Sequence, residues 1–382
     1  MPGSARRGRS RRGMGYNAPM RSLLRFFRGL NTLLLFVPVS IALHYTPHMN
    51  PLWVFLAAAL AIVPLAGMMG SATEELAAHL GASWGGLLNA TFGNATELII
   101  GLFALHAGLL GLVRASIVGS IIGNLLLVLG ASILAGGIKH KIQTFNQDQA
   151  ESHAINLLLA TLSLAVPAIF ALHYNQPNSA ANPDVEHLSL WVSGILLVVY
   201  LASLWFSLRT HESLFRDCEA EAEEDPPTWS KRTAFAVLAG ATLLIAFESE
   251  FLVSSVQGAA GRLGVNPIFI GIIVVAIIGN AAEHSTAVWM AMKDKMDITM
   301  NIAIGSSTQI AMFVAPVLVF ASLFLGHPLT YIFTVPEMTA IAFSVVITTF
   351  IAGDGKCHWL EGAQLLAAYA IIALAFFFLP PG

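Results

Sequence analysis

Two stretches of this sequence are nearly identical: residues 93–97 read GNATE and residues 279–283 read GNAAE. A Gly-Ser pair follows each stretch, at residues 119–120 and 305–306. Matched positions lie 186 residues apart (283 − 97 and 306 − 120), and in each copy the serine follows the glutamate by 23 residues (120 − 97 and 306 − 283). Chance explains one such match, but two with the same spacing predict an internal repeat.

The composition of the 382-residue chain indicates an integral membrane protein. Hydrophobic residues make up 56% of it, charged residues only 11%, and the mean hydropathy is +0.73. A soluble protein carries about a quarter charged residues, because its surface faces water. Several apolar runs exceed the ~20 residues that cross a bilayer as a helix. None of them alternates with a period of two, which argues against a porin-like barrel. We therefore expect an all-α integral membrane protein.

Eleven segments are predicted to cross the membrane as helices: 31–46, 51–69, 84–106, 110–135, 152–173, 188–208, 233–252, 267–292, 298–325, 330–352 and 359–379. Five crossings separate Glu97 from Glu283. Because five is odd, the second copy of the motif enters from the opposite face of the membrane, as in inverted-repeat transporters. The sequence thus predicts one extra N-terminal transmembrane helix followed by two inverted five-helix repeats.

This prediction divides the chain as follows: a basic cytoplasmic N-terminal segment 1–30, the extra transmembrane helix 31–46, the first five-helix repeat 51–208, an acidic cytoplasmic linker 209–232 and the second five-helix repeat 233–382. Within the linker, residues 219–225 read EAEAEED. The acidic run is interpreted either as a solvated tether or as a segment that attracts cations and regulates the protein, and both interpretations stay open.

The basic residues predict the orientation. In the predicted topology 17 of the 19 Lys and Arg residues lie on one side, since only Arg114 and Arg262 fall on the other (19 − 2). Cytoplasmic loops carry the excess of Lys and Arg, so the N-terminus is expected in the cytoplasm and the C-terminus outside. The arginine-rich segment 1–30 is also of a kind that binds nucleic acid. Topology and anionic lipid already account for it, so the expected partner is the lipid membrane and no nucleic acid.

Glu97 and Glu283 are the candidate centre of the site. Each lies well inside an apolar segment, where a charged side chain costs about 2.5–3.5 kcal/mol on insertion scales. Such residues persist where they face a cavity, a partner or an ion. A protonated glutamic acid, hydrogen-bonded inside the bundle, explains one such residue but explains two symmetry-related ones poorly. We expect the two carboxylates to form an ion site.

The neighbouring polar residues all offer hard oxygen atoms. In each motif the asparagine lies three residues before the glutamate, on the same helix face. The expected metal ligands are Glu97, Glu283, Asn94, Asn280, Ser120, Ser306, Gln309 and Asn124. Carboxylate and neutral oxygens suit Ca²⁺, which takes six to eight of them, better than Zn²⁺ or Cu⁺. For Ser120 and Ser306, small-residue helix packing is the open alternative.

Two further carboxylates, Glu75 and Glu250, are expected near the two mouths of a pathway. They are interpreted either as cation-capturing groups or as ordinary interfacial carboxylates.

Coupling of Ca²⁺ to protons follows from the charges of Glu97 and Glu283: two glutamates close together in a medium of low dielectric constant resist ionising at the same time. Ca²⁺ would replace their protons and supply the missing positive charge. One site would then bind either Ca²⁺ or protons, and exchange follows if the empty, charged site does not reorient.

These motifs carry a resemblance to a known family. Residues 93–98 (GNATEL), 279–284 (GNAAEH) and 305–309 (GSSTQ) closely resemble the repeats of the calcium/proton exchanger (cation exchanger) family, part of the calcium:cation antiporter superfamily. The resemblance extends from about residue 50 onward. It implies export of Ca²⁺ from the cytoplasm driven by proton influx, by alternating access, with Ca²⁺ as cargo and no cofactor.

The resemblance also implies roles for residues. Glu97 and Glu283 match the central carboxylates of the family, and its polar site residues match Asn94, Asn280, Ser120, Ser306 and Gln309. In the first repeat Gly123 stands at the position equivalent to Gln309, with Asn124 next to it. Only 30 residues precede the first predicted span, which favours a prokaryotic plasma (inner) membrane over a vacuole.

Three rival functions stay open at this point. The first is an antiporter of the same fold for another cation, by Mn²⁺/H⁺ or Na⁺/Ca²⁺ exchange. The second is an intramembrane enzyme, which is not expected because His284 has no helix-spaced partner histidine and no Ser/Lys or paired Asp motif occurs. The third is a passive channel, against which the inverted repeat argues. Assembly as a homo-oligomer is also left open.

Overall fold

The computed structural model describes residues 31–80, 82–173, 182–211 and 227–380, and within these residues the chain is almost entirely helical. The predicted basic segment 1–30 and most of the acidic linker, 212–226, lie outside the described residues. The expectation of an all-α protein is confirmed. One departure is a two-stranded antiparallel ladder, in which β1 (Gln143–Thr144) pairs with β2 (Lys356–Cys357).

The helices of the first half are η1 (Asn31–Leu35), α2 (Phe36–His44), α3 (Pro51–Leu80), α4 (Ala82–Phe92), α5 (Ala95–His106), α6 (Leu110–Ile122), η2 (Gly123–Val128), α7 (Leu129–Lys139), α8 (Gln147–His173), α9 (Pro183–Trp205) and η4 (Phe206–Thr210). Those of the second half are α11 (Lys231–Leu263), α12 (Pro267–Phe269), η5 (Ile270–Val275), α13 (Ala276–Gly279), α14 (Ala281–Ala291), α15 (Met296–Met300), η6 (Asn301–Gly305), α16 (Ser306–Gln309), η7 (Ile310–Val314), α17 (Ala315–Leu325), α18 (Val335–Asp354) and α19 (Trp359–Phe377). Segments η2, η4, η5, η6 and η7 are π-helical turns within longer helices.

Within the described residues, eight continuous helices are long and apolar enough to cross a membrane, and a ninth span is the bent pair 267–279 and 281–291. Two predicted spans fall on shorter apolar helices, Asn31–His44 and Ala95–His106. The total of eleven spans therefore stays a prediction. The helix beginning at Pro51 continues to Leu80, well past the predicted end at residue 69, because hydropathy marks where lipid ends and not where a helix ends.

Local sequence signals place several helix ends. Pro183 and Pro267 stand in the first turns of their helices, and the side chains of Asn182 and Asn266 cap them. Proline fits there because its missing N–H would have no partner in a first turn. At the C-terminal ends of α11, α17 and α18, glycines adopt positive φ angles of 67°, 75° and 64°, a conformation that costs glycine little.

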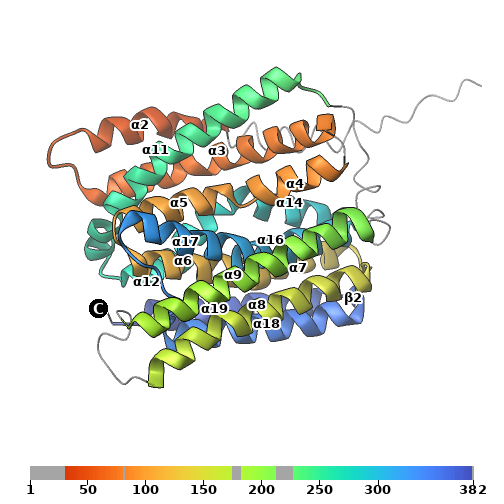
Figure 1. Ribbon diagram of the computed structural model, residues 1–382. Helices are drawn as coiled ribbons and strands as arrows, with labels where there is room; N and C mark the ends of the chain where they lie inside the picture. The colour runs from red at the N-terminus through yellow and green to blue at the C-terminus, as the bar shows by residue number, and fades with distance from the viewer. Residues whose placement is uncertain (1–30, 81, 174–181, 212–226, 381–382) are drawn as a thin grey trace, which may run out of the picture.

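The helices lie roughly side by side along one direction (Figure 1). α2, α3 and α11 pack together along one edge, at the top of the view, and α8 and α18 pack together on the opposite side. α5, α6, α14 and α16 lie between these groups. Large apolar side chains such as Trp191, Phe324 and Phe350 remain 74–89% exposed. An apolar outer surface of this kind suits lipid, so the chain is a multi-pass membrane protein.

Candidate functional site

Both repeated motifs lie where a helix breaks. The chain leaves helical geometry at Asn94 (φ −110°, ψ 27°) between α4 and α5, and at Asn280 (φ −98°, ψ 8°) between α13 and α14. At the second break the two helical pieces differ in direction by 62°. Glu97 and Glu283 each lie in the first turn of the helix that follows. The positive end of a helix dipole stabilises a carboxylate at that position.

The two asparagines reach across to the other half of the chain. Asn94 Nδ2 donates a hydrogen bond of 2.6 Å to Gln309 Oε1 on α16, and Asn280 Nδ2 donates one of 3.2 Å to Ser120 Oγ on α6. Their partners are 215 and 160 residues away in sequence. Thus an asparagine of each motif is held by a polar residue that the sequence predicted for the same site but that comes from the other half.

The two glutamates also lie in the same region of the bundle. Glu97 and Glu283 are close enough to interact electrostatically, and both are half-buried. Ser306 Oγ donates a 2.8 Å hydrogen bond to Glu283 Oε2. Glu97 Oε1 lies 3.1 Å from the point where a Cβ on Gly279 would stand, so the carboxyl group of the first motif rests against the glycine of the second. Six of the eight predicted ligands are therefore tied together in pairs.

The asparagine side chains leave two oxygens unoccupied by protein. Asn94 and Asn280 are each only 2% exposed, and their Oδ1 atoms have no hydrogen-bond partner. A buried amide oxygen without a partner is costly, so in native proteins such atoms mark bound water, ions or functional sites. The asparagine of each motif therefore offers a buried oxygen that the described protein atoms leave free.

Asn124 is the weakest member of the predicted set. It is 2% exposed on the π-helical turn η2, and its Nδ2 has no partner. Within the described residues, no hydrogen bond joins it to the glutamates or to the motif asparagines. Gln309, whose equivalent position in the first half is Gly123, does bind Asn94. π-Helical turns η5, η6 and η7 also flank the site residues of the second half, and such turns are frequent at functional sites.

The glycine that precedes Ser120 is needed for packing. A Cβ on Gly119 would overlap the carbonyl oxygen of Ile272, because α6 crosses η5 at this point. Packing and polar contact are therefore divided between neighbours: Gly119 allows the two halves to approach, and Ser120 binds Asn280. The sequence identified this pair as a repeated feature without distinguishing the two roles.

The secondary carboxylates lie outside the paired site. Glu75 accepts hydrogen bonds from Thr228 Oγ1 and, at 3.0 Å, from Trp229 N, so it binds the end of the linker. Glu250 is exposed on α11. Its neighbour Glu248 is only 1% exposed and accepts a 2.7 Å hydrogen bond from Ser40 on α2. The hydropathy pattern gave no sign that Glu248 faces the extra helix.

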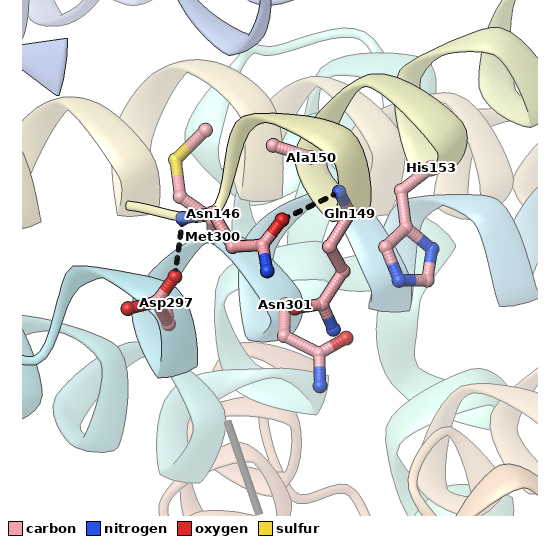
Figure 2. A pocket seen from close by; sticks show the side chains of 7 residues that line it. All are labelled: Asn146, Gln149, Ala150, His153, Asp297, Met300 and Asn301. Carbon is pink, nitrogen blue, oxygen red and sulfur yellow. Dashed lines mark hydrogen bonds between the residues drawn. The ribbon is translucent and has the colours of Figure 1, made fainter. Parts of the chain in front are cut away.

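A separate small pocket lies where α8 begins, against α15 and η6 (Figure 2). Its lining residues are Asn146, Gln149, Ala150, His153, Asp297, Met300 and Asn301. The backbone N–H of Asn146 donates a 2.5 Å hydrogen bond to Asp297 Oδ1, and Asn146 Oδ1 accepts one from the backbone N–H of Gln149. None of these residues belongs to the predicted ion site.

Within the described residues, no three His, Cys, Asp or Glu side chains gather in a group that could hold a metal ion. A cation at the paired site would thus depend on amide and hydroxyl oxygens as well as on the two carboxylates. That donor set is the kind that Ca²⁺ uses in proteins.

Comparison with known proteins agrees with this architecture. The sodium/calcium exchanger protein family matches residues 50–209 and 233–378. A Ca²⁺/H⁺ antiporter of Aphanothece halophytica is 44% identical over 361 residues, which cover 91% of this chain and 96% of the relative. A Ca²⁺/H⁺ antiporter of Synechocystis sp. is 46% identical over 363 residues, with 91% and 96% covered.

Among solved structures, the crystal structure of the Ca²⁺/H⁺ antiporter protein YfkE superposes with a TM-score of 0.77 at 40% identity, covering 93% of this chain and all of that one. Matches of this extent cover nearly the whole of the described helical bundle. The family resemblance inferred from the two GNxxE motifs is confirmed, and the chain belongs to the sodium/calcium exchanger protein family.

Proposed function

We propose that this protein is a secondary active transporter that exports Ca²⁺ from the cytoplasm in exchange for H⁺. One observation carries the proposal: Glu97 and Glu283, from opposite halves of the chain, lie close enough to interact electrostatically, and the asparagine of each motif has a buried amide oxygen with no protein partner. The relatives named Ca²⁺/H⁺ antiporter, at 44–46% identity, support the same assignment.

The chemistry follows from the charges. With both carboxyl groups ionised the site carries two negative charges, which repel one another in a medium of low dielectric constant. One Ca²⁺ neutralises both, and so do two protons, so the two cargoes compete for the same oxygens. A site that is empty and doubly charged is costly to move through the membrane. Reorientation is therefore restricted to the loaded states, which is the requirement for exchange.

The proposed Ca²⁺ ligands are Glu97, Glu283, Asn94, Asn280, Ser120, Ser306 and Gln309, with Asn124 nearby. The repeated breaks at Asn94 and Asn280, each followed by a glutamate in the first helical turn, support two inverted repeats around this site. Alternating access then consists of movement of the two halves about a shared ion.

We also propose a plasma (inner) membrane location with a cytoplasmic N-terminus. Lys139, Lys293 and Lys356 lie in or beside the segments that meet at the β1–β2 ladder, at one end of the bundle. Arg114 and Arg262 lie near the opposite helix ends. The excess of basic residues at the ladder end supports a cytoplasmic location for that end.

The experiment is Ca²⁺ uptake into proteoliposomes driven by an imposed pH gradient. Glu97→Gln and Glu283→Gln should each abolish uptake, because the amide keeps the shape but removes both the charge and the exchangeable proton. Glu151→Gln, an exposed carboxylate at the start of α8, is the control and should transport at the wild-type rate. Uptake by the wild type that ignores the pH gradient would contradict the proposal.

The same assay separates the alternative cations. Mn²⁺ in excess should compete weakly with Ca²⁺, and an imposed Na⁺ gradient should drive no uptake. Uptake driven by Na⁺ would instead assign the protein to Na⁺/Ca²⁺ exchange. Strong inhibition by Mn²⁺ with proton coupling intact would assign it to Mn²⁺/H⁺ exchange.

A further inference from the structure

A loop of the first half is fastened to the helix that carries Glu283. The loop, residues 140–146, joins α7 to α8 and includes β1. Its residue Gln143 is only 1% exposed, and its side-chain nitrogen donates two hydrogen bonds, of 2.8 Å to Ala291 O and of 3.0 Å to Asp294 Oδ1. Ala291 is the last residue of α14, and Asp294 lies in the turn that follows.

The helix α14 has non-helical backbone at both ends. It begins after the break at Asn280 and ends in a turn in which Asp294 adopts a positive φ of 64°. Its 11 residues make it about 16 Å long. A short helix between two such breaks is free to tilt unless its neighbours hold it. Because Glu283 is in its first turn, a tilt of α14 would change the distance between the two glutamates.

The buried contact of Gln143 is suited to holding the end of α14 in place. Its amide occupies space that exists only because residue 136 is glycine: a Cβ there would overlap Gln143 Oε1 and stand 2.7 Å from Ala291 O. The chain thus brings α7, the loop and the end of α14 together at one buried point. Asp294, the second acceptor, also lies 3.8 Å from His140 Nδ1 of the same loop.

The remaining contacts of the loop hold other elements. Asn146 N binds Asp297 in the first turn of α15 (Figure 2), and Gln147 Nε2 donates a 2.6 Å hydrogen bond to Gly353 O near the end of α18. Gln143 is the loop side chain whose hydrogen bonds reach the end of α14. Gln147, the first residue of α8, directly follows the loop but binds elsewhere, so it provides a matched control.

We infer that Gln143 is a positioning residue for Ca²⁺ binding: through Ala291 and Asp294 it fixes the tilt of α14 and hence the place of Glu283 opposite Glu97. This inference rests on the proposed function. Gln143 touches no ion. Replacement of Gln143 therefore changes the geometry of the Ca²⁺ ligands, and this change weakens Ca²⁺ binding although no ligand is removed.

The test compares the wild type, Gln143→Leu and Gln147→Leu. Calorimetry on the purified proteins measures Ca²⁺ affinity, and uptake at varied Ca²⁺ concentration measures KM and the maximal rate. Gln143→Leu should weaken Ca²⁺ binding and raise KM by about tenfold, equivalent to about 1.4 kcal/mol. Gln147→Leu should match the wild type. Gln143→Asn, too short by one methylene to reach Ala291, should shift KM in the same direction and serves if the leucine variant does not fold.

Equal KM values for the wild type and both Gln143 variants would overturn the inference. So would a shift in Gln147→Leu as large as in Gln143→Leu, because the effect would then come from loosening the loop as a whole. A wild type that takes up no Ca²⁺ under a pH gradient would contradict the proposed function instead. Failure of the proposed function and failure of the inference on Gln143 therefore give different results.

Discussion

At the scale of single residues, the two motifs match in sequence but differ in their contacts. Ser306 and Ser120 are equivalent by position, yet Ser306 donates to Glu283 while Ser120 accepts from Asn280. Glu97 rests against Gly279. The pair of carboxyl groups is therefore held asymmetrically, with the side chain of Glu283 oriented by a hydroxyl and that of Glu97 placed by close approach to a backbone.

This asymmetry predicts a specific role for the hydroxyl of Ser306. A hydrogen bond to an ionised carboxylate contributes about 1.5–3 kcal/mol, so Ser306→Ala should raise the KM for Ca²⁺ by about tenfold or more. Uptake at varied Ca²⁺ concentration measures the change.

The adjacent Ser307 supplies the control. It is fully buried, and its hydroxyl donates to Ala303 O within its own helix at 2.9 Å and to Ile121 O of α6 at 3.5 Å, but it makes no hydrogen bond to either glutamate. Ser307→Ala should therefore leave KM near the wild-type value. If the two alanine variants behave alike, the bond between Ser306 and Glu283 does not orient the ligand.

At the scale of elements, the site depends on how closely helices of the two halves cross. α6 and η5 meet where Gly119 faces the backbone of Ile272 and Gly271 faces Ala115. The crossing brings Ser120 within reach of Asn280, which lies a few residues beyond η5. Small residues serve the same purpose in membrane proteins generally, because they let helix backbones approach.

Gly119 on α6 and Gly123 at the start of η2, which continues α6, should differ in how a substitution changes the stability of the protein. Gly119→Ala should destabilise the protein by about 1–3 kcal/mol or more, because the added methyl group overlaps backbone that has little freedom to move. Gly123→Ala should be neutral or stabilising, since no atom lies within 4 Å of the added Cβ. The melting temperature and the yield of monodisperse protein measure both effects. Equal losses in the two variants would show that the crossing is not the critical contact.

At the scale of the whole molecule, the distribution of charge predicts the orientation of the protein in the membrane. The loops that contain Lys141, Lys293 and Lys356 gather at the end with the β1–β2 ladder, and the C-terminal end of α19 lies at the other end (Figure 1). This distribution supports the proposed cytoplasmic N-terminus. The direction of net Ca²⁺ movement depends instead on the ion gradients across the membrane.

Labelling of single cysteines tests the orientation. In a variant with Cys218 and Cys357 replaced by serine, His327→Cys should react with a membrane-impermeant maleimide in intact cells. Lys141→Cys should react only after the cells are opened. Both positions are exposed, so accessibility from each side decides the result. Labelling of Lys141→Cys in intact cells would reverse the proposed topology.

The positions of most helices could be predicted from the sequence, and the acid pair could be proposed from it, because both depend on one-dimensional information. Apolar length determines where the chain enters lipid. The 186-residue offset identifies Glu97 and Glu283 without any knowledge of packing. Helix ends were predicted less well: the helix from Pro51 runs on to Leu80, since a helix continues into water where its residues favour it.

The sequence by itself thus determined that the chain is a membrane protein whose polar residues offer oxygen atoms, and it predicts that the two halves are related. Only the tertiary structure decided which of those residues meet. Asn94 binds Gln309, which is 215 residues away in sequence, and Gln143 binds Ala291 at the end of α14, which is 148 residues away. Such contacts depend on the angle and register at which helices cross, which are set by packing between segments distant in sequence and leave no periodic signal in either segment.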